Sequence, residues 1–68
     1  MNITLNNREE HIAGREEMSV KELLEYKNYT FKFLVVRING RAVKPSEYES
    51  AVISNGDEVQ VIHLISGG

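Results

Sequence analysis

The sequence contains no cysteine, and this absence limits what kind of protein it can be. Without thiols the chain forms neither disulfide bonds nor thiolate metal sites, which are the usual supports of very small secreted domains. It also lacks an apolar run of membrane-spanning length, and its start has no basic, apolar and small-residue signal pattern. These absences predict a soluble cytoplasmic protein that does not act at a membrane.

Basic residues are missing from the last third of the chain. All eight lysines and arginines lie between Arg8 and Lys44, whereas residues 45–68 carry only acidic charges. The net charge of −2 argues against nucleic acid as a partner. Because opposite charges steer encounters between proteins, one interpretation is a protein partner with a basic surface. The other is a chance fluctuation over a short stretch.

A length of 68 residues leaves room for one small domain and no second core. Such a chain buries only about 60% of its unfolded surface, so a stability of roughly 3–5 kcal/mol is expected. We expect residues 1–65 to form the domain and residues 66–68 to form a flexible C-terminal tail.

Local signals divide the chain into strands and one helix. Alternating apolar residues indicate half-buried strands, and Ser19 with Glu22 forms a capping box at a helix start. Asn39-Gly40 is a strong hairpin signal, and Pro45 ends the returning strand. The expected elements are a strand at residues 1–6, a weaker antiparallel strand at 8–13 with Ile12 inward, a helix from Ser19 to about 26–28, and strands at 33–38, 41–43 and 58–65.

This order of elements predicts an α+β fold. The helix must bury its apolar face against one side of a sheet, and the first and last strands pair in the middle. The prediction is a β-grasp (ubiquitin-like) fold, a mixed five-stranded sheet with one main helix packed on one face. A helical turn at residues 46–50 should point Tyr48 inward. The predicted core residues are Ile3, Leu5, Val20, Leu23, Leu24, Val36, Ile38, Val43, Val59 and Val61.

No arrangement of residues indicates catalysis. His11 and His63 are far apart and neither has a partner at metal-ligand spacing, so both are interpreted as partly exposed strand residues. The acidic pairs at residues 9–10 and 16–17 do not converge in a helix or strand and are interpreted as solvated charge. We therefore expect no catalytic residue, no metal and no bound cofactor. The protein is expected to be a substrate or partner of enzymes.

The last strand predicts an apolar patch. If Val59 and Val61 point into the core, the alternate residues of that strand face outward, as do those of the neighbouring strand. Exposed apolar patches often mark partner sites. The alternative is that a twisted strand lets these residues cover the core. The expected partner-binding residues are Ile62, Leu64, Val35 and Arg37.

The sequence ends at Gly67-Gly68, shortly after this strand. Ordering two glycines costs much conformational entropy. A diglycine end forms a thin thread without side chains, which can enter a narrow active site and present the Gly68 carboxylate as the reacting group. A frayed terminus or a truncated chain is the alternative.

Several of these features also occur together in one known family. They are Ser19-Val20 and Leu23-Leu24 at the helix, Asn39-Gly40 followed by Val43, the aromatic Tyr48, the turn Asn55-Gly56-Asp57-Glu58-Val59, and the terminal Gly67-Gly68. In this order, over essentially the whole chain, they resemble the sulfur carrier proteins of thiamin biosynthesis, the ThiS family.

The resemblance implies a cycle of two steps. An E1-like adenylating enzyme of the ThiF type would use ATP and Mg²⁺ to convert the Gly68 carboxylate to an acyl adenylate. A sulfur donor would then give the Gly68 thiocarboxylate, with Ser66 and Gly67 as the rest of the tail. A thiazole synthase of the ThiG type would take that sulfur for the thiazole ring.

Two other functions stay open at this point. The small subunit of molybdopterin synthase has the same fold and thiocarboxylate chemistry, but those chains tend to be longer and have a proline-containing approach to the diglycine. A ubiquitin-like protein modifier would be joined to lysines and would give isopeptide conjugates. A purely structural β-grasp module leaves Gly67-Gly68 unexplained.

Overall fold

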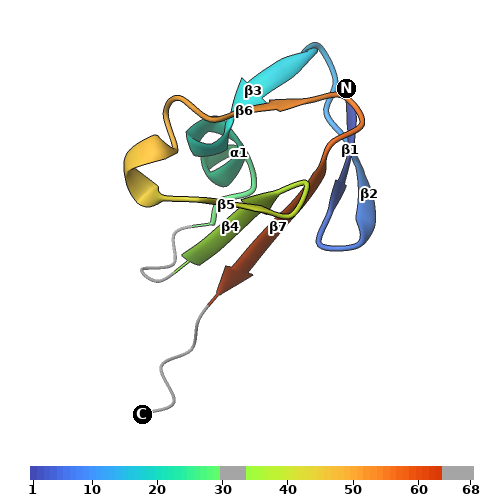
Figure 1. Ribbon diagram of the computed structural model, residues 1–68. Helices are drawn as coiled ribbons and strands as arrows, with labels where there is room; N and C mark the ends of the chain where they lie inside the picture. Colours follow the sequence, from blue (N-terminus) through green and yellow to red (C-terminus); the bar gives the residue numbers. More distant parts are fainter. Residues whose placement is uncertain (30–33, 64–68) are drawn as a thin grey trace.

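The computed structural model describes residues 1–29 and 34–63 (Figure 1). The predicted positions Phe33, Leu64, Ser66, Gly67 and Gly68 lie outside the described residues. The elements are β1 (Asn2–Leu5), β2 (Arg8–His11), β3 (Glu17–Ser19), α1 (Val20–Tyr26), β4 (Leu34–Ile38), β5 (Arg41–Val43), the 3₁₀ helix η1 (Pro45–Glu47), β6 (Val52–Ser54) and β7 (Glu58–His63).

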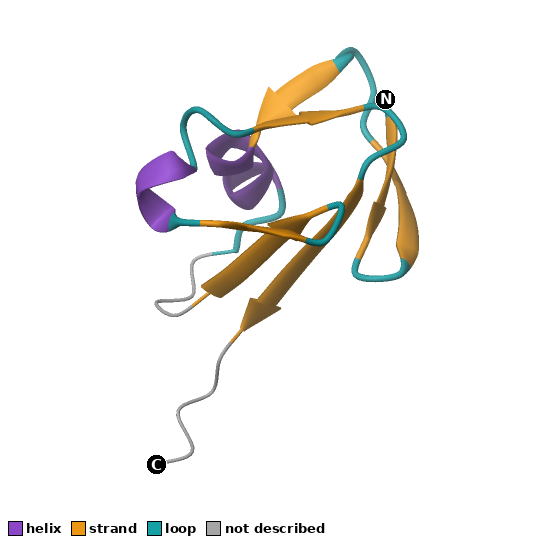
Figure 2. Ribbon diagram, in the orientation of Figure 1, coloured by secondary structure: helices purple, strands orange, loops and turns teal. Residues whose placement is uncertain are grey.

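Five of the strands form one sheet in the order β2-β1-β7-β4-β5. The first and last strands, β1 and β7, lie side by side and run parallel, whereas the other neighbours are antiparallel. The helix α1 packs on one face of this sheet (Figure 2). The predicted β-grasp with a mixed five-stranded sheet is confirmed. None of the helices in the described part of the chain is long and apolar enough to cross a membrane.

A second, smaller sheet was not predicted. In it β3 pairs antiparallel with β6, and Met18 lies opposite Ile53. Both side chains are buried. Glu17, one of the acidic residues interpreted as solvated charge, is exposed and belongs to β3. Strands of three residues are too short to show an alternating pattern, because such a pattern needs about four to eight residues.

The core lies between α1, the five-stranded sheet and the small sheet. Of the predicted core residues, Leu24, Ile38 and Val43 are only partly buried, and the others are buried. Ile12 points inward as expected. The buried residues are Ile3, Leu5, Ile12, Met18, Val20, Leu23, Val36, Ile53, Val59 and Val61.

The helix begins as its capping box predicts. The Glu22 N–H donates to the Ser19 hydroxyl at 3.1 Å, and the Ser19 N–H donates to the Glu22 carboxylate at 2.9 Å. The other oxygen of that carboxylate lies 2.7 Å from the Arg15 guanidinium. These bonds satisfy two backbone donors that have no partner within the helix.

One acidic residue differs from the prediction. Glu10 was interpreted as solvated charge, but its carboxylate forms an ion pair with Lys27 at 2.9 Å, and both side chains are largely covered. The pKa of Lys27 is raised, chiefly because its ammonium group donates a hydrogen bond to Glu10. The pair joins the end of α1 to the edge strand β2, a contact across 17 positions that adjacent-residue reasoning could not reveal.

The helical turn expected after β5 is present and begins one residue earlier than predicted. Its 3₁₀ helix covers Pro45–Glu47, and the N–H groups of Ser50 and Ala51 donate to the Glu47 carbonyl, so the turn continues through residues 48–50. Tyr48 follows the 3₁₀ helix and is partly buried against the core, as predicted.

Candidate functional site

The face of the sheet that points away from α1 carries the predicted patch. Val35 on β4 lies directly opposite Ile62 on β7, and Arg37 lies opposite Gln60. Between these pairs, Val36 and Val61 point the other way and are buried. Ile62 is 40% exposed, which is high for a large aliphatic side chain in a sheet.

We call Val35, Arg37 and Ile62 the outer patch. The structure therefore brings together three of the four predicted partner-binding residues, and Leu64 lies outside the described residues. Gln60 and Ala42 border the patch, because both lie opposite Arg37 on the neighbouring strands. These two were not among the predicted partner-binding residues, although the same alternation of side chains places them there.

Two asparagine side chains hold the strand β7, one in its second half and one at its start. The Val61 N–H donates to Asn6 Oδ1 at 2.8 Å, and Asn6 Nδ2 donates to the Val61 carbonyl at 3.2 Å. At the start of the strand, the Glu58 N–H donates to Asn39 Oδ1 at 2.8 Å. Both asparagines have left-handed backbones, with φ of 51° at Asn6 and at Asn39. The side chains thus continue the ladder where β1 and the hairpin end.

These roles were missed because Asn39 was interpreted only as a turn residue and Asn6 as the end of the first strand. Asparagine is one of the few residue types that readily adopts a left-handed backbone. The available signal was an asparagine at a turn beside a strand. The partner of Asn6, Val61 on β7, is however more than fifty positions away in the sequence. The result is a fixed position for the strand that precedes residues 64–68 in the sequence.

The described residues contain no group of three or more His, Cys, Asp or Glu side chains placed to hold a metal ion. His11 and His63 are exposed strand residues, as predicted, and β1 lies between their strands. The His11 ring contacts Asn2 Oδ1 at 2.6 Å. The structure does not bring the two histidines together. The expectation that the protein binds no cofactor stays a prediction.

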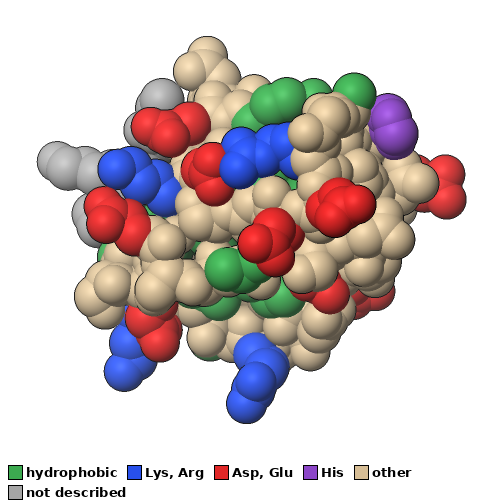
Figure 3. Space-filling view, turned by 90° about the horizontal axis from the view of Figure 1, so that it is seen from above, with side chains coloured by type: hydrophobic (Ala, Val, Ile, Leu, Met, Phe, Trp, Pro, Cys, Tyr) green, Lys and Arg blue, Asp and Glu red, His purple; other side chains and the backbone are tan. Residues whose placement is uncertain are grey.

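The charges on one face of the molecule are mixed rather than grouped by sign (Figure 3). Seen from above, from the side of β3 and β6, acidic and basic side chains alternate, and apolar side chains are visible between them (Figure 3). One basic residue of the first half, Lys21, lies 3.4 Å from a carboxylate of the last third, Glu49. Arg15 and Lys27 instead pair with glutamates of the first half, Glu22 and Glu10.

The family model of the ThiS family matches residues 3–68. The chain belongs to the ThiS family. The matched range includes the outer patch, both asparagines that hold β7, and the terminal diglycine. The family assignment made from the sequence pattern is confirmed.

Two solved structures of a ThiS relative are similar over the whole chain. The crystal structure of the thiamine biosynthesis protein ThiS from Geobacter metallireducens superposes with a TM-score of 0.90, at 26% identity, covering 100% of both chains. The solution structure of a thiamine biosynthesis protein from the same organism gives a TM-score of 0.81 at 26% identity. That match covers 100% of this chain and 88% of the other.

Proposed function

We propose that this protein is a sulfur carrier of thiamine biosynthesis, with the Gly68 carboxylate as the group that carries sulfur. The observation that carries the proposal is the match to the ThiS family over residues 3–68, together with the whole-chain likeness to a thiamine biosynthesis protein. In this proposal the protein is acted on by enzymes and is not itself a catalyst. Its cytoplasmic location stays a prediction from the sequence.

The chemistry requires activation of the carboxylate. A free carboxylate is ionised at neutral pH and is a poor electrophile. In the proposed cycle one Gly68 carboxylate oxygen attacks the α-phosphorus of ATP, in the presence of Mg²⁺, and pyrophosphate leaves. Hydrosulfide or an equivalent sulfur nucleophile then attacks the acyl carbon, and AMP leaves with the former carboxylate oxygen. The product is a thiocarboxylate at Gly68, which is the sulfur source for thiazole formation.

Two enzymes are needed as partners, an E1-like adenylating enzyme of the ThiF type and a thiazole synthase of the ThiG type. The outer patch is proposed as the surface that docks the adenylating enzyme, because exposed apolar residues on a sheet face fit the centre of a protein interface. Residues 65–68, if fully extended, reach at most about 13–14 Å. This reach allows Gly68 to enter an active site while the sheet stays docked outside, and glycine presents no side chain that would obstruct a narrow channel.

The proposal predicts a change in the mass of the protein. The purified chain is incubated with an adenylating enzyme of the ThiF type, ATP, Mg²⁺ and sulfide. The intact mass should rise by the difference between sulfur and oxygen, and fragmentation should place the change at Gly68. Omission of ATP should prevent the change, because the carboxylate is then not activated.

Two variants and two alternative products make this test decisive. Deleting Gly68 should abolish the mass change while the fold survives. Gly67→Val should suppress it, because a β-branched side chain stiffens and widens the thread. An unchanged wild-type mass with an active enzyme would contradict the proposal. Lysine conjugates would instead indicate a protein modifier, and sulfur transfer only to a molybdopterin synthase large subunit would indicate that pathway.

A further inference from the structure

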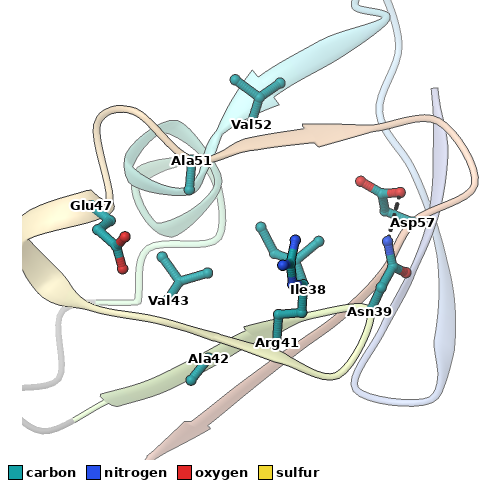
Figure 4. Close-up of a pocket in the computed structure, with 9 residues that line it drawn as sticks. All are labelled: Ile38, Asn39, Arg41, Ala42, Val43, Glu47, Ala51, Val52 and Asp57. Atoms are coloured by element: carbon teal, nitrogen blue, oxygen red, sulfur yellow. Dashed lines mark hydrogen bonds between the residues drawn. The ribbon is translucent and has the colours of Figure 1, made fainter.

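A cleft of about 550 Å³ lies between the edge strand β5 and the small-sheet strand β6 (Figure 4). Its floor is formed by side chains on the inner side of the sheet, whereas the outer patch lies on the other face. Only Ala42, at the sheet edge, borders both. Ile38, Val43 and Ala51 point into it, and all three are partly buried (Figure 4). Its volume lies within the range of about 300–1,000 Å³ that is common for ligand sites.

One wall of the cleft is a free strand edge. The turn Asn39-Gly40 has φ of 51° and 82°, as in the two-residue turns of tight hairpins. Its flanking residues Ile38 and Arg41 are in register and form the hydrogen-bonded pair that closes the turn. Bonded and non-bonded pairs alternate in an antiparallel ladder, so the N–H and C=O of Ala42 point away from β4. No other described residue pairs with them.

The opposite wall is a second free edge. The Val20 N–H donates to the Ala51 carbonyl at 3.0 Å, in register with β3 and β6. By the same alternation, the N–H and C=O of Val52 point away from β3. The Ser54 N–H, two residues along β6, confirms this direction because it donates to Asp57 and not to β3. Ala42 and Val52 both line the cleft, so each wall offers unpaired backbone donors and acceptors.

We propose that this cleft binds an extended segment of a partner protein, which adds to β5 as a further strand. An extended backbone is the ligand whose donors and acceptors match a free strand edge. A second folded copy of this chain does not fit as well. If the β5 strand of a second copy paired with this free edge, the β4 strand attached to it would fall in the place that β6 occupies. A single strand with both of its own edges free has no such conflict.

The side chains of the cleft define the kind of segment. Arg41 points into the cleft and has no ion-pair partner among the described residues (Figure 4). Both acidic side chains there already accept hydrogen bonds, since Asp57 binds Asn39 and Ser54 and Glu47 binds the Lys44 N–H. Arg41 and Val43 lie on the same face of β5, two residues apart. The segment should therefore carry an acidic residue opposite Arg41 and an apolar residue two positions away, opposite Val43.

The probe for this proposal is a bead-displayed library of random blocked heptapeptides. Fluorescently labelled wild-type protein and the variant Ala42→Pro are panned against it in parallel. Proline at this position removes the outward N–H without breaking a bond to β4, and edge strands tolerate proline there. Ala42→Ser keeps the N–H and is the matched control. Peptides recovered by the wild type and by Ala42→Ser, but not by Ala42→Pro, should pair an acidic with an apolar residue two positions apart and should lack proline.

A recovered peptide is then titrated into ¹⁵N-labelled protein. The largest shifts should fall on Ala42 and Val43, and Ala42→Pro should weaken binding by about three- to tenfold, the effect of one lost hydrogen bond. If Ala42→Pro does not fold, Arg41→Glu is the second variant. This variant should bind basic peptides in place of acidic ones.

Several results would overturn the proposal. One is recovery of the same peptides by Ala42→Pro, and another is a set of shifts on the outer patch instead of β5. A third is no recovery above beads without peptide. A further contradicting result could come from sedimentation. A wild-type dimer that Ala42→Pro abolishes would assign the edge to a second copy of the chain.

Discussion

At the scale of single residues, polar side chains hold the start of the helix and two positions of the last strand. Ser19 and Glu22 exchange hydrogen bonds at the start of α1. Asn6 and Asn39 do the same for β7, each with its backbone in the left-handed region. Each of these side chains replaces a backbone partner that the element lacks at its end. In a domain this small, such bonds are a large share of the total stability.

The capping glutamate predicts a dependence of stability on pH. The pKa of Glu22 is below its usual 4.5, first because its carboxylate accepts the Ser19 N–H bond and second because Arg15 lies beside it. A lowered pKa in the folded state means that the stabilisation is present above pH 4.5 and is lost as the pH falls through the folded-state pKa. Glu22→Gln should therefore be less stable than the wild type at neutral pH, and the difference should shrink below pH 4.5.

Urea unfolding at a series of pH values measures this difference. Glu25→Gln changes an exposed glutamate of the same helix and gives the baseline. A difference between wild type and Glu22→Gln that stays constant down to acidic pH would contradict the explanation.

At the scale of elements, α1 is held by the burial of one face, and β7 by partners on both sides. Val20 and Leu23 are fully buried, whereas Leu24 is only partly covered. The strand β7 pairs with β4 along its described length, but on its other side β1 ends at Leu5. Beyond that point the Asn6 side chain takes the place of a neighbouring strand.

The packing of α1 predicts unequal effects of two leucine truncations. Leu23→Ala should cost about 2–5 kcal/mol of unfolding free energy, because it leaves a cavity in the core. Leu24→Ala is the matched control, with the same change of side chain at a partly buried position, and should cost clearly less. Chemical denaturation compares the two. A loss below about 1 kcal/mol for Leu23→Ala would contradict the packing of this helix face.

Removal of the hydrogen bonds between Asn6 and Val61 should loosen the strand β7 locally. Asn6→Gly removes the amide that binds Val61 but tolerates the left-handed backbone, so it tests the hydrogen bonds without adding strain. The Val61 amide should exchange with solvent faster, and the unfolding free energy should fall by about 1 kcal/mol. Asn7→Gly is the matched control, because Asn7 also has a positive φ of 67° but no described side-chain bond to β7. If both variants speed the exchange of the Val61 amide equally, the Asn6 hydrogen bonds do not hold the strand.

At the scale of the whole molecule, the sheet has one face buried under α1 and one face open, and the outer patch lies on the open face. This arrangement would separate stability from the proposed docking. Residues of the inner face form the core, and residues one position away in the same strands are free to contact a partner. Substitutions on the open face therefore test the proposed function without first unfolding the domain.

The docking role predicts a loss of affinity without a loss of fold. Ile62→Asp should weaken binding to the adenylating enzyme by about tenfold or more, because a charge is unfavourable in the apolar centre of an interface. Tyr26→Asp is the control, because Tyr26 is 55% exposed but lies on α1, on the other side of the sheet. Calorimetric titration measures both affinities, and circular dichroism checks the fold. Unchanged binding of a folded Ile62→Asp variant would remove the outer patch from the proposed interface.

Features that depend on neighbouring residues could be predicted from the sequence. The capping box at Ser19 spans three positions, the Asn39-Gly40 turn two, and the alternation in β7 fixes which of its residues face the core. The energies of these features come from contacts within a few residues. The sequence alone therefore determined the helix start, the hairpin and which side chains of the outer patch point away from the core. The family assignment followed from the order of such local features.

Features that depend on residues far apart in the chain were decided only by the tertiary structure. The small sheet pairs residues 17–19 with residues 52–54, the Glu10–Lys27 ion pair joins an edge strand to the end of the helix, and Asn6 binds Val61. In each case neither partner has a distinctive local pattern, because the interaction exists only after the chain has brought them together. The cleft between β5 and β6 has the same origin, since its two free edges become a binding site only when folding places them opposite each other.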